Sequence, residues 1–218
     1  YYSPFNYSDQ TIDRLTLSHE WLQSTDLAVR TALVQDRRSL DMVRNAGGNP
    51  GNSADDMTGR NARQQTDDAR YLNFQNEIIW KLGNPSNRHT ILGGIEFTDT
   101  SVDTMRTGYN LASITDIYQP QVPETTLTGS PVVAQGFDRT LTSRGWGLYA
   151  QDQIAFGEQF KVRAGIRTER FDVEDDGQQA GTARTIKDTV SFTTGSFGAV
   201  WQPTPTASLY TGWSNGKF

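Results

Sequence analysis

The 218-residue sequence contains no cysteine and only two histidines. Without cysteine the chain cannot form a disulfide framework, a cysteine zinc site, an iron–sulfur cluster or a thiol nucleophile. No segment approaches the roughly 18 consecutive apolar residues of a membrane-spanning helix, and the first residues lack the basic and apolar regions of a signal peptide. The formal net charge of -5 argues against a nucleic-acid-binding module, because such modules usually carry a basic surface.

Catalytic and metal-binding motifs are also lacking. His19 and His89 read as boundary or turn residues, and no Gly-x-Ser-x-Gly, phosphate-loop or dinucleotide-binding fingerprint occurs. Carboxylates cluster at 55–56, 67–68 and 174–176 without calcium-loop spacing, so we interpret them as solvated loop charges. We therefore predict a protein that is not an enzyme, with no catalytic, cofactor-binding or metal-binding residues.

Aromatic residues, in contrast, are plentiful at 11% of the chain. Disordered segments are poor in aromatics, so this content excludes a disordered protein. What remains is a soluble β-rich protein or a transmembrane β-barrel. A barrel escapes hydropathy analysis because only alternate residues of its strands need to be apolar.

The clearest pattern in the sequence is a period of two residues. In segment 160–169, Phe160, Val162, Ala164 and Ile166 alternate with mainly charged residues. A β-strand sends these two sets to opposite faces, whereas a helix would scatter them around its axis. About eight such strands are predicted, at 10–22, 26–40, 66–82, 88–103, 139–156, 159–174, 187–202 and 206–217.

The connections between these strands alternate in length. Short links at 23–26, 83–87, 157–158 and 203–205 separate strands within pairs, and long polar stretches at 41–65, 104–138 and 175–186 separate the pairs. Outer-membrane barrels have short periplasmic turns and long extracellular loops. Trp21, Trp80, Phe156, Phe160 and Trp201 lie next to the short links, as in an interfacial aromatic girdle. A soluble β-sandwich, in which these aromatics form a core, remains the alternative.

Several segments carry a family resemblance. Segments 149–154 and 164–171, with a short turn between them, resemble the barrel of TonB-dependent outer-membrane receptors, as do 92–97, 198–203 and 208–214. Segment 114–120 is similar to an acidic–Ile–aromatic–Asn–Pro motif of ferric-siderophore receptors, with Gln119 in place of asparagine. The chain departs from the family at Thr168, where an aromatic is more common, and at Trp201, where tyrosine is common.

The resemblance implies an all-β fold, an antiparallel transmembrane β-barrel, of which residues 1–218 would supply about eight strands. Receptors of this family have about 22 strands and an N-terminal plug domain, so we expect an internal portion of a larger barrel without its plug. The implied function is outer-membrane import of an iron–siderophore complex, a hydroxamate type being one candidate. The iron would belong to the ligand, so no cofactor is expected.

The implied partners are the ferric siderophore, the TonB–ExbB–ExbD energy-coupling complex acting through the plug, and outer-membrane lipid with lipopolysaccharide. Nucleic acid is not expected. The alternatives are a self-contained eight-stranded outer-membrane barrel, acting as an adhesin or structural protein, and a soluble carbohydrate-binding β-protein.

The predicted inward faces are strongly polar. Lys161, Arg163 and Arg167 form one row that could attract an anionic ferric complex or contact the plug. We favour the interpretation that this row pairs with carboxylates on neighbouring strands, namely Glu77, Glu96 and Glu169. Tyr109 and Tyr118 are possible ligand contacts in a loop, but no ligand-binding residue can be assigned from the sequence.

Overall fold

The computed structural model describes residues 4–46, 49–50, 57–58, 60–84, 86–113, 127 and 131–216. Its main feature is one sheet of eight antiparallel strands in the order β1-β2-β5-β6-β7-β8-β9-β10, and β3 pairs with β4 separately. The strands are β1 (Tyr7–Leu22), β2 (Leu27–Ala46), β3 (Asn49–Pro50), β4 (Met57–Thr58), β5 (Asn61–Asn84), β6 (Asn87–Asn110), β7 (Pro131–Phe156), β8 (Phe160–Gln179), β9 (Thr182–Thr204) and β10 (Ala207–Ser214).

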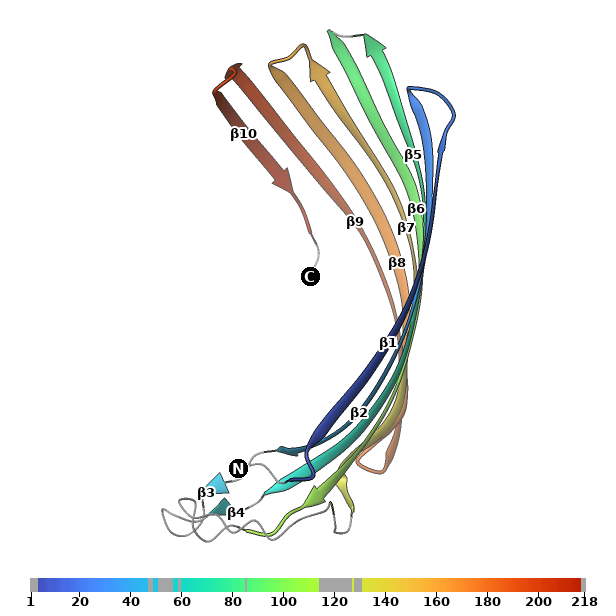
Figure 1. Ribbon diagram of the computed structural model, residues 1–218, viewed down its shortest axis with the longest axis vertical. Coiled ribbons are helices and arrows are strands. Elements are labelled where there is room, and N and C mark those ends of the chain that lie inside the picture. Colours follow the sequence, from blue (N-terminus) through green and yellow to red (C-terminus); the bar gives the residue numbers. More distant parts are fainter. Residues whose placement is uncertain are drawn as a thin grey trace.

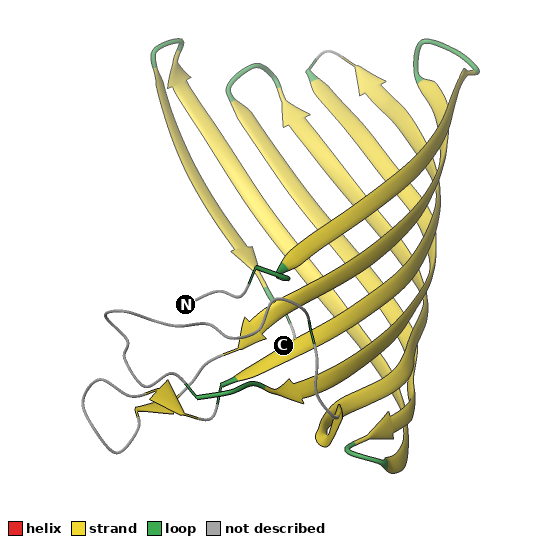
Figure 2. Ribbon diagram, turned by 60° about the horizontal axis from the view of Figure 1, so that its bottom comes forward, coloured by secondary structure: helices red, strands yellow, loops and turns green. Residues whose placement is uncertain are grey.

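The sheet curves in one direction, so that it has a concave and a convex face (Figure 1). Figure 2 shows the inclined strands as a section of a cylinder wall that is open between β1 and β10. These two edge strands each pair with a single neighbour among the described residues. The arrangement confirms the predicted antiparallel all-β fold and all eight main strands.

The strand register is nearly continuous. The β5–β6 pairing runs without interruption from Asn61 opposite Asn110 to Asn84 opposite Asn87. Shifts occur between Arg106 and Gly108 in the β6–β7 pair and next to Ala207 in the β9–β10 pair. Because directly opposite residues share a face, the register assigns each side chain of the curved sheet to one side.

The strands are longer at one end than the sequence pattern indicates, and one connection was predicted wrongly. Residues 175–186 form no long polar loop, since β8 and β9 continue to a turn at Ala180 and Gly181. Both turn residues have positive φ, 52° and 78°. The hydropathy alternation fades here because both faces are polar, while backbone pairing continues.

The opposite end of the sheet has only short connections (top of Figure 1). Local side chains hold two of these turns. The Ser24 hydroxyl accepts hydrogen bonds from the backbone amides of Asp26 and Leu27, at 3.1 and 3.0 Å. The Asn84 side chain accepts from the amides of Ser86 and Asn87, both at 3.0 Å. Such side-chain acceptors favour tight turns over continued strand.

The convex face is apolar and exposed. Only Val43, Ala62 and Leu111 are buried apolar residues in the described part of the chain, so the sheet has almost no core of its own. The apolar set on the convex side includes Trp21 at 55% exposure, Ile166 at 59% and Trp213 at 62%. Contiguous apolar surface of this extent marks an interaction with lipid or protein, which a soluble sandwich would instead enclose between two sheets.

The apolar surface forms a band of limited height. On β7 it runs from Phe156 to Trp146, about 33 Å of strand, or about 25 Å along the cylinder axis at a tilt of about 40°. Beyond it the same face becomes charged, with Arg144 Nε 3.3 Å from the Asp99 carboxylate. The band height equals that of the lipid-facing belt of outer-membrane barrels. In the described residues, no helix is long and apolar enough to cross a bilayer.

Candidate functional site

The concave face carries a connected polar cluster near the middle of the sheet, which we call the concave polar network. Strand register brings its members together from four strands. One row places Glu77, Gly94, Tyr149 and Arg167 opposite one another, and the next row places Gln75, Glu96, Gly147 and Glu169 together. Asn73 lies one row further along β5.

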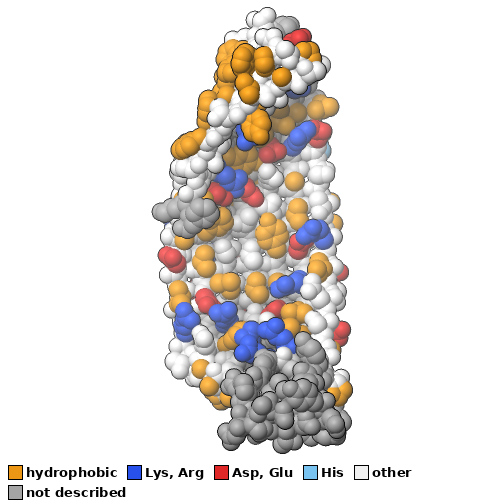
Figure 3. Space-filling view, turned by 90° about the vertical axis from the view of Figure 1, so that its left-hand side faces the viewer, with side chains coloured by type: hydrophobic (Ala, Val, Ile, Leu, Met, Phe, Trp, Pro, Cys, Tyr) orange, Lys and Arg blue, Asp and Glu red, His pale blue; other side chains and the backbone are white. Residues whose placement is uncertain are grey.

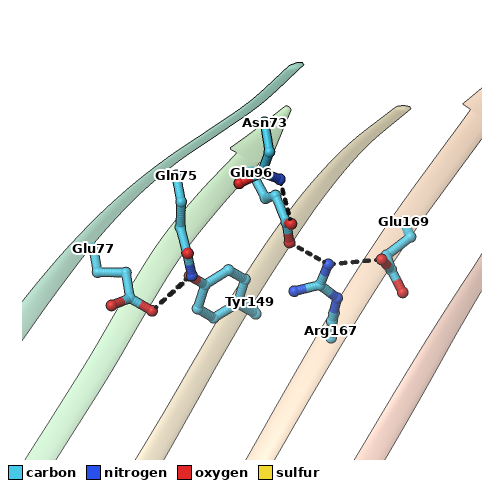
Figure 4. Close-up of polar contacts among 7 residues, drawn as sticks. All are labelled: Asn73, Gln75, Glu77, Glu96, Tyr149, Arg167 and Glu169. Carbon is cyan, nitrogen blue, oxygen red and sulfur yellow. Dashed lines mark hydrogen bonds and ion pairs between the residues drawn. The ribbon is translucent and has the colours of Figure 1, made fainter. Parts of the chain in front are cut away.

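Arg167 is the centre of the network (Figure 4). Its Nη2 atom lies 2.6 Å from Glu96 Oε2 and 2.7 Å from Glu169 Oε1, so one guanidinium bridges two carboxylates. The other oxygen of Glu96 accepts a hydrogen bond of 2.7 Å from the Asn73 amide. The Arg167 guanidinium also lies over the Tyr149 ring, at 5.2 Å from its centroid. These contacts hold Arg167 in one position, because a planar donor suits both carboxylates and an aromatic face.

Tyr149 connects this group to β5. Its hydroxyl donates to Glu77 Oε1 at 2.7 Å and accepts from the Gln75 amide at 2.7 Å. The ring needs the space above Gly94, because a Cβ atom there would collide with the Tyr149 ring. Glycine at position 94 is therefore part of the site, since it allows the aromatic side chain to lie flat across the strand.

The network carries an excess of negative charge. Its charged side chains are the carboxylates of Glu77, Glu96 and Glu169 and the single guanidinium of Arg167, so three negative charges face one positive charge. All four side chains are partly solvated. The arrangement can hold four neighbouring strands in register and attract a cationic group within the curve of the sheet.

The expected pairing of the inward-facing cations is confirmed only in part. Arg167 pairs with Glu96 and Glu169 as predicted. Glu77, however, bonds to Tyr149 and Gln75 instead of a cation. The other two predicted partners, Lys161 and Arg163, are exposed and make no ion pair with described residues.

Two predicted ligand contacts have different outcomes. Tyr109 lies within strand β6, not in a loop, and its hydroxyl donates to Gln64 at 3.4 Å. Because side chains alternate between the two faces along β6, Tyr109 lies on the convex face, opposite the concave polar network. Tyr118, like the family motif at 114–120 that contains it, lies outside the described residues.

The carboxylate clusters lie in strands and not in loops where they are described. Asp67 is 7% exposed within β5, and it accepts hydrogen bonds from Gln65 at 2.9 and 3.1 Å. Glu174 pairs with Lys187 at 2.7 Å across β8 and β9. The assignment to loops was wrong because the strands extend further than hydropathy indicates, whereas Asp68 and Asp176 are exposed to solvent as predicted. The pair 55–56 lies outside the described residues, and within the described ranges no three metal-ligating side chains converge.

One polar contact on the convex face was missed by sequence reasoning. His89 Nδ1 lies 2.7 Å from Asp152 Oδ2, near the short turns. The two residues are 63 positions apart, and only the β6–β7 register brings them together. His19 lies exposed on the same face near Trp21, at a boundary position as expected.

An antiparallel curved sheet with an apolar outer band, a polar inner face and aromatics beside its short turns is the wall of a wide transmembrane β-barrel. The family model described as "TonB dependent receptor-like, beta-barrel" matches residues 1–216. The chain therefore belongs to the TonB-dependent receptor β-barrel family. Members of this family are outer-membrane receptors and not enzymes. This agrees with the predictions of an outer-membrane barrel and of a protein without enzymatic activity.

Solved structures support the same fold. The chain is similar to the ferric-catecholate import receptor Fiu from E. coli K12 in its closed form, with a TM-score of 0.79 and 18% identity over 97% of this chain and 33% of Fiu. The siderophore receptor PiuA from Acinetobacter baumannii gives a TM-score of 0.73 and 17% identity over 97% of this chain and 33% of PiuA.

The ferric yersiniabactin uptake receptor FyuA from Yersinia pestis gives a TM-score of 0.69 and 12% identity over 95% of this chain and 28% of FyuA. The chain thus spans about a third of the length of these receptors. A comparison with curated protein sequences gave no significant match.

Proposed function

We propose that this chain forms part of the barrel wall of an outer-membrane receptor that imports an iron–siderophore complex, with energy supplied through TonB. The observation that carries the proposal is the division of the sheet into an apolar convex band and a polar concave face. Family membership and similar receptors whose names specify siderophore or ferric-complex uptake support the ligand class.

The transport chemistry requires no bond to be made or broken by the barrel. The convex band would face lipid, with lipopolysaccharide in contact beyond its charged rim, and the concave face would line a hydrated interior. The negative excess of the concave polar network suits a plug domain that presents basic side chains to it. Through that plug, the TonB–ExbB–ExbD complex would couple release of the ligand to the inner-membrane proton gradient.

The other two candidate functions have less support. A self-contained eight-stranded barrel requires β1 to pair with β10, whereas each is an edge of the sheet. In hydrocarbon, unpaired edges are costly, so we propose that further strands complete the barrel. A soluble carbohydrate-binding protein would not expose an apolar band about 25 Å high.

Iron uptake by intact cells tests the proposal. Cells lacking the gene should lose accumulation of labelled iron from at least one ferric siderophore, and expression of the protein should restore it. Uptake should stop when TonB is removed or when a protonophore collapses the proton gradient. An Arg163→Gln variant provides a control because Arg163 is exposed and unpaired among described residues. Undiminished siderophore-dependent uptake in cells lacking the gene, across a panel of siderophore classes, would contradict the proposal.

A further inference from the structure

Four arginines gather on the concave face at the end of the sheet away from the short turns. Arg44 lies opposite Arg63 across β2 and β5, Arg106 lies on β6, and Arg139 lies on β7. We call these four residues the arginine cluster. Figure 3 shows Lys and Arg side chains gathered on this face next to the region drawn in grey. Arg106 is close enough to Arg63, Arg44 and Arg139 to be repelled by all three, and it is attracted by the carboxylate of Asp67.

An aromatic ring organises the β6–β7 side of the cluster. The guanidinium carbons of Arg106 and Arg139 lie 4.4 and 4.9 Å from the centroid of the Phe137 ring. One ring thus contacts two cations, each of which gains from the negative face of the ring. These contacts restrict both long side chains, and the N–H groups of each guanidinium that face away from its protein partners can still donate hydrogen bonds.

The cluster is only partly neutralised by its neighbours. Arg106 donates from Nε and Nη2 to the neutral amide oxygen of Gln65, at 3.0 and 2.8 Å. Arg139 has a 3.3 Å contact with Asp175. Arg63 Nε is buried and has no hydrogen-bond partner, and Arg44 is exposed without an ion pair to described residues. Two directly opposed arginines cost stability unless an anion lies between them.

Both faces carry charged residues at this end of the sheet. The convex side carries Asp9 opposite Asp41 and Asp68 opposite Asp103, and also Arg37 opposite Arg70. The cations of the cluster lie on the concave side, although the whole chain has a formal net charge of -5. The concave side also holds Asp67, 3.9 Å from Arg38, and Asp175 beside Arg139. The four arginines of the cluster outnumber these two carboxylates, so a solute entering from the loop end of the barrel would meet an excess of positive charge.

We propose that the arginine cluster binds a ferric chelate of net negative charge, through its carboxylate or catecholate oxygens. Three hydroxamates only balance the charge of Fe(III), whereas three catecholates leave an excess of three negative charges. Guanidinium donors prefer anionic oxygens and bind them with two hydrogen bonds. The inference rests on the proposed function and replaces the hydroxamate candidate from the sequence with an anionic class.

Ligand binding to the complete receptor in detergent tests this assignment. The probes are a ferric tricatecholate and a neutral ferric trihydroxamate, titrated against the wild type and an Arg44→Gln/Arg63→Gln variant. The Arg163→Gln variant is the matched control, because it removes a concave-face cation near the short turns. We expect tricatecholate affinity to fall at least tenfold in the double variant and to weaken with added salt in the wild type. The control should retain its affinity.

The outcomes separate this inference from the proposed function. If the receptor binds only the neutral trihydroxamate, or if cluster and control variants lose tricatecholate affinity equally, the anionic assignment is overturned while siderophore import stands. If neither chelate binds and no siderophore supports uptake in cells, the proposed function itself fails. The single variant Arg44→Gln guards against misfolding, because Arg44 is exposed, and it should still weaken tricatecholate binding several-fold.

Discussion

At the scale of single residues, neighbouring positions on one strand meet different surroundings. Ile166 is exposed on the convex face, whereas the adjacent Arg167 bonds to two carboxylates on the concave face. An Ile166→Arg substitution should lower the free energy of unfolding in lipid vesicles by about 2–4 kcal/mol, because it places a charge against hydrocarbon. The measurement is denaturant unfolding of the complete protein, with Arg163→Ala as a control on the same strand. Similar costs for both variants would contradict the assignment of faces.

Removal of the bridging guanidinium should also be costly. Arg167→Met leaves Glu96 and Glu169 facing one another without their shared cation, so we expect a loss of about 1–3 kcal/mol in unfolding free energy. Adding Glu96→Gln to this variant should recover part of the loss, because the repulsion between the carboxylates disappears. A double variant that is less stable than Arg167→Met would show that these residues act independently of one another.

Residue roles were predictable from the sequence where alternation alone decides them. The sides of Ile166 and Arg167 followed from a period of two, and cross-strand pairing of Arg167 with Glu96 was expected on chemical grounds. The hydrogen bond of Tyr149 to Glu77 and the contact of His89 with Asp152 could not be predicted from the sequence. Both depend on the register between strands that are distant in sequence. Register is fixed by turns and bulges that hydropathy does not reveal.

At the scale of elements, the β8–β9 hairpin is the part most altered from expectation. Its turn holds Ala180 and Gly181 at positive φ, as a two-residue type I′ hairpin turn requires. Ala180→Asn should stabilise the hairpin by about 0.5–1 kcal/mol, because asparagine tolerates this conformation better than alanine. Amide hydrogen exchange at residues 176–186 measures the effect, and slower exchange is the expected result.

A matched change at the next residue should act in the opposite direction. Gly181→Ala introduces a Cβ at positive φ, and that atom would lie 2.9 Å from the Val133 side chain. The same amides should exchange faster in this variant. If both variants changed exchange in the same direction, the turn would not be of the proposed type.

Strand existence was predictable from sequence, but strand ends at the loop side were not. Segments within the apolar band alternate with few exceptions, such as Asn76 and Asp152, and all eight were recognised there. Outside the band both faces meet water, so polar residues such as Asp175 and Asp176 occupy paired strand positions without any alternation. Only backbone pairing marks those positions as strand. The arginine cluster lies in this outer region, which is why the sequence pattern did not reveal it.

At the scale of the whole molecule, the open sheet makes a specific demand on its surroundings. Strands β1 and β10 expose one side of their backbone, and unpaired backbone groups cost several kcal/mol each in hydrocarbon. The described strands therefore need partners beyond this sheet to remain in a bilayer. The curvature seen in Figure 2 fits a cylinder of larger diameter than a closed eight-stranded barrel would have.

The distance between the two edge strands tests this architecture directly. The eight strands leave seven spacings of about 4.8 Å between β1 and β10, or about 34 Å along the sheet. Spin labels at Leu17 and Thr211, in the complete receptor reconstituted in lipid, should accordingly report a separation of several strand widths. A pair at Phe74 and Phe97, directly opposite on β5 and β6, calibrates the distance of adjacent strands. If the edge pair gave the same short distance as this control, β1 and β10 would be neighbours in a closed eight-stranded barrel. The interior would then be too narrow for a plug, and the import proposal would fail with the wide barrel.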